Sequence, residues 1–204
     1  EVLALAKEQG VPVREVSAAV IGRMSSLGEP ASMLALTGRK PGDSFEAVLE
    51  QGGAIWVLLG VAYPTNAGVA IRTAEGCGAS AIVIDAPSFD HVARRSATRA
   101  SMRADWYMPV FWSDARDAIQ RARSAGYAVY AVENTGDTAP WEVDLSGPVV
   151  FAVGGESHGI PEDVLAASDR VLRVPMGGFI PSFNLQIALG VVGVERLRQI
   201  SRSD

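Results

Sequence analysis

Three polar segments, each just after an apolar run, carry the residues of this sequence best suited to chemistry. In the first, Asn66 and Gly68 follow the apolar run 54–61 and open a predicted helix. Asn66 can cap that helix, and Gly68 lets another backbone approach closely. Arg72 offers the planar fork of donors that suits a phosphate. On this segment alone, a helix cap and a surface arginine are the simpler interpretation.

The second segment, residues 153–161, combines a glycine pair with a carboxylate. Gly154 and Gly155 expose backbone N–H groups that can grip a ligand. Glu156 stands at the end of a predicted strand, where ligands collect in parallel sheets. A plain loop with an exposed glutamate explains this segment, taken alone, equally well.

The same segment matches the hydrolase pattern G-x-S-x-G around Ser157. That fold places its catalytic histidine after the serine, where the base can reach the nucleophile. Here His91 lies upstream and His158 adjoins the serine. A Ser157 hydrolase is therefore the weakest alternative.

The third segment is a Pro/Gly loop, residues 174–185, between a predicted strand and a long predicted helix at 182–200. Ser182 is predicted to cap this helix. Ser182 and Asn184 would offer hydroxyl and amide groups at the positive end of the helix. The alternative is that Ser182 is only a cap and Asn184 an incidental polar residue.

Residues 91–123 form a basic region in an acidic chain. They hold seven arginines and three aspartates, a local charge of +4 in a chain of formal charge −5. Arg95, Arg99 and Arg103 are spaced four apart, so on a helix they form one ridge suited to a phosphate backbone. Arg94 belongs to the same cluster, and a solvated helix face is the alternative for all four.

The elements that must position these residues alternate between strand and helix. Strands are predicted at 54–61, 81–85, 108–112, 127–132, 149–153 and 171–174. Helices are predicted at 66–77, 91–104, 113–125, 161–167 and 182–200. The alternation predicts an α/β fold with a mostly parallel sheet flanked by helices.

The region before this pattern is short. Helices are predicted at 2–10 and 18–24, with a short strand at 11–16 between them. The turn-rich stretch 37–43 is the best candidate linker. We therefore divide the chain into residues 1–42, too few for an independent core, and residues 43–204.

Composition excludes several classes of protein. The chain has 204 residues, 48% of them hydrophobic and 20% charged, which is ordinary for a globular protein. The longest uncharged apolar stretch, residues 52–61, is too short to span a bilayer. One cysteine excludes an internal disulfide framework, and with only two histidines no metal site is expected. No secretory signal pattern is present, so we expect a cytoplasmic protein with no membrane partner.

Taken together and in this order, the three segments resemble the SpoU/TrmH family of SPOUT-class RNA 2′-O-ribose methyltransferases. The first family motif, N-x-G-x-x-x-R-T-A, is matched from Asn66 to Ala74. The second is matched by Gly154, Glu156, Gly159 and Ile160, and the third by Pro175, Met176, Gly178, Ser182 and Asn184. The sequence departs from the third motif at Val174, Phe183 and Gln186, where the family usually has isoleucine, leucine and serine.

The resemblance implies transfer of a methyl group from S-adenosylmethionine to a ribose 2′-hydroxyl of tRNA or rRNA, with no metal and no DNA partner. It implies a homodimer, a deep C-terminal trefoil knot, and an L30-like substrate-binding domain of which residues 1–42 are the end. A catalytically inactive RNA-binding relative is the alternative.

The resemblance also assigns roles to individual residues. The catalytic group would be Arg72, Asn66, Glu156, Ser182 and Asn184. The cofactor would be held by Gly154, Gly155, Val174, Met176, Gly178 and Phe183. The candidate RNA contacts are the arginines of the basic region, Arg94, Arg95, Arg99 and Arg103.

Overall fold

The computed structural model describes residues 2–24, 32–35, 44–180 and 182–201, and its contacts divide the chain into two compact units, Glu1–Gly38 and Arg39–Asp204. The first unit contains α1 (Val2–Glu8) and α2 (Ala18–Met24), neither of which has a buried residue. Residues 11–16, predicted as a strand, form none, because no other strand of the described part of this unit is there to pair with them. The predicted linker 37–43 lies outside the described residues, and the relation of residues 1–42 to an L30-like domain stays a prediction.

The second unit is built on a six-stranded, fully parallel sheet in the order β3-β2-β1-β5-β4-β6. The predicted strands are confirmed, most of them to within one or two residues at each end. They are β1 (Ala54–Leu59), β2 (Ala81–Asp85), β3 (Val110–Phe111), β4 (Ala128–Val132), β5 (Val149–Gly154) and β6 (Arg170–Leu172).

The central strands are buried on both faces, which explains their continuous apolar sequence. In β1, Ile55 and Val57 point into one core, while Trp56 and Leu58 point into the other. The ring centroids of Trp56 and Phe151, on neighbouring strands, lie 4.6 Å apart. Alternation of side chains along each strand thus builds two cores around one sheet.

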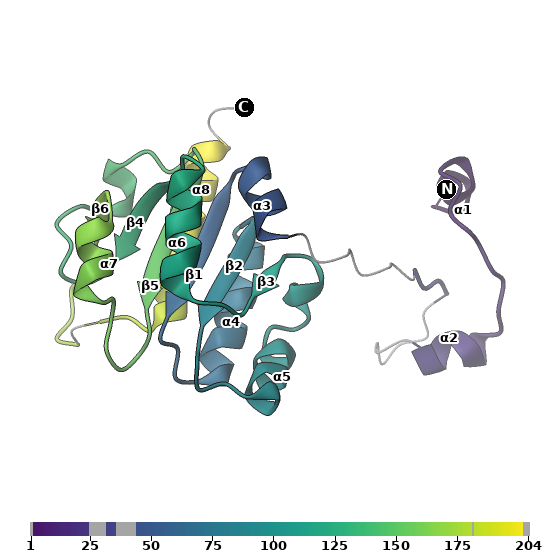
Figure 1. The fold of residues 1–204 in the computed structure, drawn as a ribbon. Helices are drawn as coiled ribbons and strands as arrows, with labels where there is room; N and C mark the ends of the chain where they lie inside the picture. The colour runs from purple at the N-terminus through teal and green to yellow at the C-terminus, as the bar shows by residue number, and fades with distance from the viewer. Residues whose placement is uncertain (1, 25–31, 36–43, 181, 202–204) are drawn as a thin grey trace. The chain divides into compact units, whose positions relative to one another are not determined.

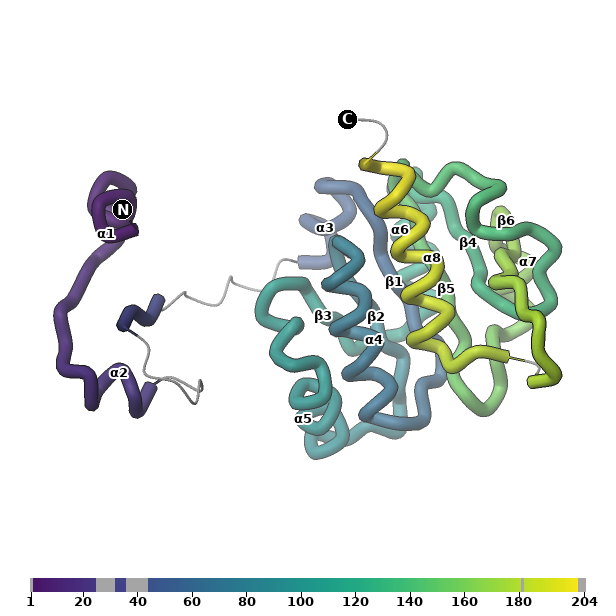
Figure 2. Tube along the Cα trace, turned by 180° about the vertical axis from the view of Figure 1, so that it is seen from behind, coloured from purple at the N-terminus to yellow at the C-terminus, as the bar shows by residue number. Residues whose placement is uncertain are grey.

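Helices cover both faces of the sheet. One core is closed by α3 (Phe45–Gln51), α6 (Ala115–Ser124) and α7 (Glu162–Ala167), which lie in front of the sheet in Figure 1. The other is closed by α4 (Pro64–Gly76), α5 (His91–Ala100) and α8 (Leu185–Ile200), seen in Figure 2. Two short 3-10 helices, η1 (Ala104–Trp106) and η2 (Pro140–Glu142), interrupt the connections. The trefoil knot implied by the resemblance stays a prediction.

Close packing of α4 on its neighbours depends on glycine. A Cβ at Gly68 would lie 2.3 Å from the carbonyl oxygen of Ala97 in α5. A Cβ at Gly193 of α8 would lie 2.7 Å from the Cβ and Sγ atoms of Cys77. Gly68 therefore permits the close backbone approach that the sequence predicts, and Gly193 serves packing inside the chain.

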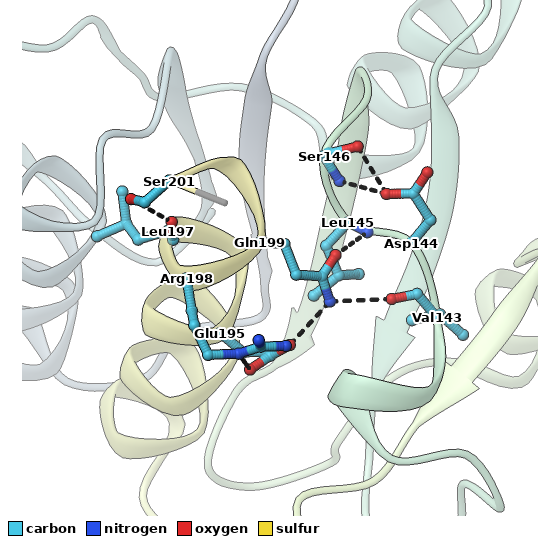
Figure 3. A network of polar contacts seen from close by, with 9 residues as sticks. All are labelled: Val143, Asp144, Leu145, Ser146, Glu195, Leu197, Arg198, Gln199 and Ser201. Carbon is cyan, nitrogen blue, oxygen red and sulfur yellow. Dashed lines mark hydrogen bonds and ion pairs between the residues drawn. The ribbon is translucent and has the colours of Figure 1, made fainter. Parts of the chain in front are cut away.

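The C-terminal end of α8 is tied to the connection that precedes β5. The Gln199 amide donates to the carbonyl of Val143 at 3.0 Å and accepts from the backbone N–H of Leu145 at 2.7 Å (Figure 3). Glu195 accepts from the guanidinium of Arg198 and from Gln199. These bonds fix the C-terminal end of α8. The loop from β6 joins α8 at its other end.

Within the described ranges, no helix combines the length and the apolar character needed to cross a membrane. A cytoplasmic location stays a prediction.

Candidate active site

A pocket of about 320 Å³ opens beyond the carboxyl ends of β4 and β5. Three stretches of chain line it, residues 132–134, residues between 153 and 159, and residues between 174 and 188. Its walls are apolar at Val132, Val153 and Leu185, with carboxylate, amide and hydroxyl groups between them. The second and third polar segments of the sequence therefore meet in one cavity, although about 12 residues separate them along the chain.

Glu156 connects the first segment to this pocket. Its Oε1 accepts from the amide nitrogen Nδ2 of Asn66 at 2.5 Å, and its Oε2 accepts from the backbone N–H of Ala62 at 3.0 Å. Glu156 itself lines the pocket. One carboxylate thus holds the start of α4 against the pocket wall through two charge-assisted hydrogen bonds.

Asn66 reaches Glu156 from inside the helix and does not cap it. α4 begins at Pro64, whose fixed φ suits the first helical position, and Tyr63 occupies the N-cap. The predicted cap at Asn66 is therefore wrong. The earlier start turns the Asn66 amide away from the backbone N–H groups and toward the carboxylate of Glu156.

The glycine pair serves the packing of backbone on backbone. A Cβ at Gly154 would lie 2.3 Å from the carbonyl carbon of Gly159, and one at Gly155 would lie 2.2 Å from the carbonyl oxygen of Gly60. The N–H of Gly155 donates to the carbonyl of Leu59 at 2.7 Å. The expectation that this N–H grips a ligand is wrong, although both glycines line the pocket.

The third segment supplies pocket walls and free polar groups. Helix α8 begins at Leu185 with Asn184 at its N-cap, so Ser182 does not cap it as predicted. Ser182 and Asn184 both line the pocket, and within the described residues neither side chain has a hydrogen-bond partner. Their hydroxyl and amide groups are thus available to a ligand.

The predicted cofactor residues are placed almost entirely in this pocket. Gly154, Gly155, Val174, Met176 and Phe183 line it. Gly178 does not, because the loop carries it out to the exposed surface.

The structure does not bring Arg72 to the other predicted catalytic residues. Arg72 is exposed on α4 and does not line the pocket. It lies six residues, more than one and a half turns, beyond Asn66, so the two side chains leave the helix on different faces. A single copy of the chain therefore leaves the guanidinium outside the cavity.

The basic region divides into two groups. Arg116, Arg121 and Arg123 form ion pairs with Asp163, Asp117 and Asp169 at 2.7, 3.2 and 3.0 Å, and Arg121 also pairs with Glu46. The carboxylate of Asp163 raises the pKa of Arg116 above its usual value through a hydrogen bond and their Coulomb attraction. These arginines are engaged within the chain.

The other four arginines of the region do not form the continuous ridge predicted for Arg95, Arg99 and Arg103. Helix α5 ends at Ala100, and Arg103 follows in a left-handed conformation with φ of 68°. Arg94 lies over the ring of Trp112, with its guanidinium carbon 5.3 Å from the ring centroid. In the described part of the chain none of the four has an ion pair.

Sequence reasoning missed Glu133 and Asn134, which line the pocket just after β4. The Glu133 carboxylate accepts from the backbone N–H groups of Asn134 at 2.9 Å and Ile160 at 3.3 Å. Glu133 directly follows a predicted parallel strand, and an acidic residue at that place could have been predicted to line the site.

The hydrolase alternative finds no support in the geometry. Ser157, His158 and His91 are all exposed. Across the described ranges, no hydrogen bond joins Ser157 to a histidine and no group of His, Cys, Asp and Glu residues could hold a metal ion.

Comparison with known proteins places the chain among RNA methyltransferases. The model of the SpoU rRNA Methylase family matches residues 53–194. An uncharacterized tRNA/rRNA methyltransferase of Mycobacterium ulcerans is 30% identical over 208 residues, which cover 98% of this chain and 66% of that protein. The 23S rRNA (guanosine-2'-O-)-methyltransferase RlmB of Pseudomonas putida is 28% identical over 97% of this chain and 82% of that protein.

A solved structure agrees with these relatives. The AdoMet-bound rRNA methyltransferase from Sinorhizobium meliloti aligns with a TM-score of 0.66 at 31% identity, over 73% of this chain and 57% of that one. The chain spans about two thirds of the length of the mycobacterial relative.

Proposed function

Since this chain belongs to the SpoU rRNA Methylase family, we propose that it transfers a methyl group from S-adenosylmethionine to a ribose 2′-hydroxyl of an RNA. The observation that carries the proposal is the Glu156 carboxylate, which lines the pocket and binds both Asn66 and Ala62. Through it, the start of the first motif is bonded to the cavity in which the second and third motifs meet. The names of the relatives from Mycobacterium ulcerans and Pseudomonas putida, a tRNA/rRNA and a 23S rRNA methyltransferase, support RNA as the substrate.

The pocket fits S-adenosylmethionine. Its volume of about 320 Å³ falls within the range of small-molecule sites. The cofactor has a flat aromatic adenine, a ribose diol, a positively charged sulfur, and an amino-acid group with an ammonium and a carboxylate. Val174, Met176 and Phe183 offer apolar surface to the adenine, and the carboxylates of Glu133 and Glu156 suit the cationic and hydroxyl groups.

The protein has mainly a positioning task. The bound cofactor supplies a methyl group that its sulfonium already activates. Asn66 and Glu156 fix the start of α4 beside the pocket, and Ser182 and Asn184 present donors and acceptors to the ribose. Arg72 binds the phosphate beside the target ribose and stabilises developing negative charge. A guanidinium does not readily give up its proton at neutral pH, so we assign Arg72 no role as a base.

Because Arg72 lies outside the pocket of its own chain, we include a homodimer in the proposal. The exposed side of α4 carries Val69 and Arg72, one turn apart. α8 packs beside α4 and exposes Ile187 and Val194. An apolar contact between two copies across these helices would bring the partner subunit's Arg72 toward this pocket.

Two measurements test the proposal. The first is calorimetric titration of the full chain with S-adenosylmethionine, with one site per chain expected. The second is transfer of tritiated methyl to unmodified tRNA and rRNA transcripts. A 2′-O-methyl group blocks alkaline cleavage at its own nucleotide, so the label is expected in an alkali-resistant dinucleotide. Label released in a single nucleotide would refute ribose methylation, and RNA binding without cofactor binding would establish the inactive relative.

A further inference from the structure

Four arginines on one short stretch of the surface have no carboxylate partner among the described residues. They are Arg94, Arg95, Arg99 and Arg103, all exposed, on α5 and the turn that follows it. The arginines of α6, in contrast, are all engaged with aspartates or a glutamate. In a chain of net charge −5, this surplus of unpaired cations favours an anionic partner at α5.

Exposed aromatic side chains lie in the same stretch. Trp106 is 47% exposed and Tyr107 is 73% exposed, and they follow each other directly at the end of η1. The guanidinium carbon of Arg103 lies 4.6 Å from the centroid of the Trp106 ring. Contiguous exposed apolar side chains mark interaction sites, and tyrosine, tryptophan and arginine are enriched at interfaces. We name Arg99, Arg103, Trp106 and Tyr107 the η1 surface.

The backbone that carries these side chains is held in a strained turn. Met102 and Arg103 have φ of 54° and 68°, in the left-handed region that residues with side chains rarely adopt. The start of the turn is fixed to the core of the protein. Ser101 is buried, and its hydroxyl donates to the carbonyl of Thr98 at 2.7 Å. Ala104 and Met108 are buried on either side of the exposed aromatic pair. The rings are therefore presented on a fixed support, which lowers the entropy lost on binding.

The start of α5 lies at the same end of the sheet as the pocket, and the η1 surface follows the end of α5, before β3. α5 follows the carboxyl end of β2, and the pocket opens at the carboxyl ends of β4 and β5. The first two turns of α4 join them, since Asn66 is bonded to Glu156 of the pocket and Gly68 packs on Ala97 of α5. Figures 1 and 2 show α5 beside the start of α4. An RNA strand whose target nucleotide occupies the pocket can extend over α5.

We propose that Trp106 and Tyr107 form a stacking surface for an unpaired base of the RNA, with Arg99 and Arg103 at the adjoining phosphates. The proposal rests on the proposed function, because it takes the partner to be RNA. Bases in a duplex have their faces covered by their neighbours, whereas bases in loops and single strands are free to stack on aromatic rings. The η1 surface therefore selects an RNA that has unpaired nucleotides besides the one that enters the pocket.

The test compares single-stranded with double-stranded RNA on the full chain. We would measure the fluorescence anisotropy of a short fluorescein-labelled oligoadenylate, alone and annealed to oligouridylate, for the wild type and for Trp106→Leu and Tyr107→Leu. Trp141→Leu is the matched control, because Trp141 is 53% exposed but lies on η2. We expect tighter binding of the single strand. Each leucine variant of the η1 surface should weaken it by about 5- to 100-fold, and Trp141→Leu should leave it unchanged.

Two further readouts separate stacking from a structural effect. Trp106→Phe keeps an aromatic face and is expected to restore most of the affinity lost in Trp106→Leu. Quenching of tryptophan fluorescence by the unlabelled single strand should disappear in Trp106→Leu while the midpoint of thermal unfolding stays unchanged.

The phosphate contact is tested by Arg99→Ser. This variant should reduce the slope of the logarithm of the binding constant against the logarithm of the salt concentration by about 0.7, as for one lost phosphate contact on a single strand.

Several outcomes would overturn the stacking surface. They are equal binding by Trp106→Leu and Trp141→Leu, preference for the duplex, or no binding of the single strand by the wild type. The last result would leave a protein partner as the occupant. Methyl transfer and cofactor titration are measured on the same wild-type preparation. If methyl transfer and cofactor binding are absent while the single-strand results are as expected, the proposed function is refuted and the stacking surface is supported.

Discussion

Replacing Gly68 by alanine should lower the stability of the protein, although alanine is the better helix former. The new Cβ would lie 2.3 Å from the carbonyl oxygen of Ala97 and 2.5 Å from the Cβ of Ala100. Both atoms belong to α5, so α5 must move away from α4. Overpacking of this kind costs about 1–3 kcal/mol.

The helix propensity of alanine offsets part of this cost. Alanine in place of a helical glycine stabilises the folded state by about 0.5–1 kcal/mol. The net loss is then about 1–2 kcal/mol, which for a chain of this length lowers the midpoint of thermal unfolding by about 2–8 °C. Circular dichroism during heating would measure it.

Gly76, in the same helix, is the matched control. Apart from its own stretch of helix, no described atom lies within 4 Å of a Cβ placed there, and its φ is not positive. Gly76→Ala should leave the midpoint unchanged or raise it. A Gly68→Ala protein as stable as the wild type, or a Gly76→Ala protein that loses as much, would refute the packing of α4 on α5 described above.

Three other substitutions and one chemical modification test the site and the core. Arg72→Ala should keep cofactor binding in calorimetry and lose methyl transfer, because Arg72 lies outside the pocket. Glu156→Gln replaces an acceptor of two hydrogen bonds and should weaken cofactor binding about tenfold, by the ~1–3 kcal/mol cost of mispairing. Arg196 is buried, and its Nε has no partner among the described residues, so Arg196→Met should raise the unfolding midpoint. Burial raises the pKa of the Cys77 thiol, so iodoacetamide should modify it far more slowly in the native protein than in urea.

Each of these expectations has a result that contradicts it. Turnover in Arg72→Ala would remove Arg72 from the proposed machinery, and loss of cofactor binding there would place it in the pocket. Unchanged cofactor binding in Glu156→Gln, with Glu162→Gln on α7 as the control, would show that the carboxylate does not support the pocket. A lower midpoint in Arg196→Met would mean that the guanidinium has a partner in solution. Fast labelling of native Cys77 would show that α8 opens readily.

The strands could be predicted because a strand that is buried on both faces of the sheet has an uninterrupted apolar sequence. The runs that became β1 and β5 are apolar without interruption, and their neighbours in the sheet repeat the pattern. α3 was missed because its Phe45–Gln51 segment is short and directly follows the turn-rich stretch before it. Residues 11–16 show the opposite error, since apolar alternation forms a strand only where another strand can pair with it.

Helix starts and the free groups at the site could not be predicted from residue types. A capping preference placed the starts at Asn66 and Ser182, but Pro64 begins α4 earlier and α8 begins later, at Leu185. The Gly155 N–H looked free in the sequence, although Leu59, on the neighbouring strand, accepts its hydrogen bond. These outcomes depend on contacts between segments far apart in the chain.

The pairing of β1 with β5 sets the order in which this protein can fold. It aligns Ala54 with Val149, about 95 residues apart along the chain, so closing that loop costs more chain entropy than closing the shorter crossovers between β1, β2 and β3. β1, β2 and β3 are joined by nearer crossovers and can assemble first, with α4 and α5 in place. The pocket needs β4, β5 and the start of α8, so it forms in the later, slower phase. Ligand binding during refolding should therefore lag behind the first gain of secondary structure.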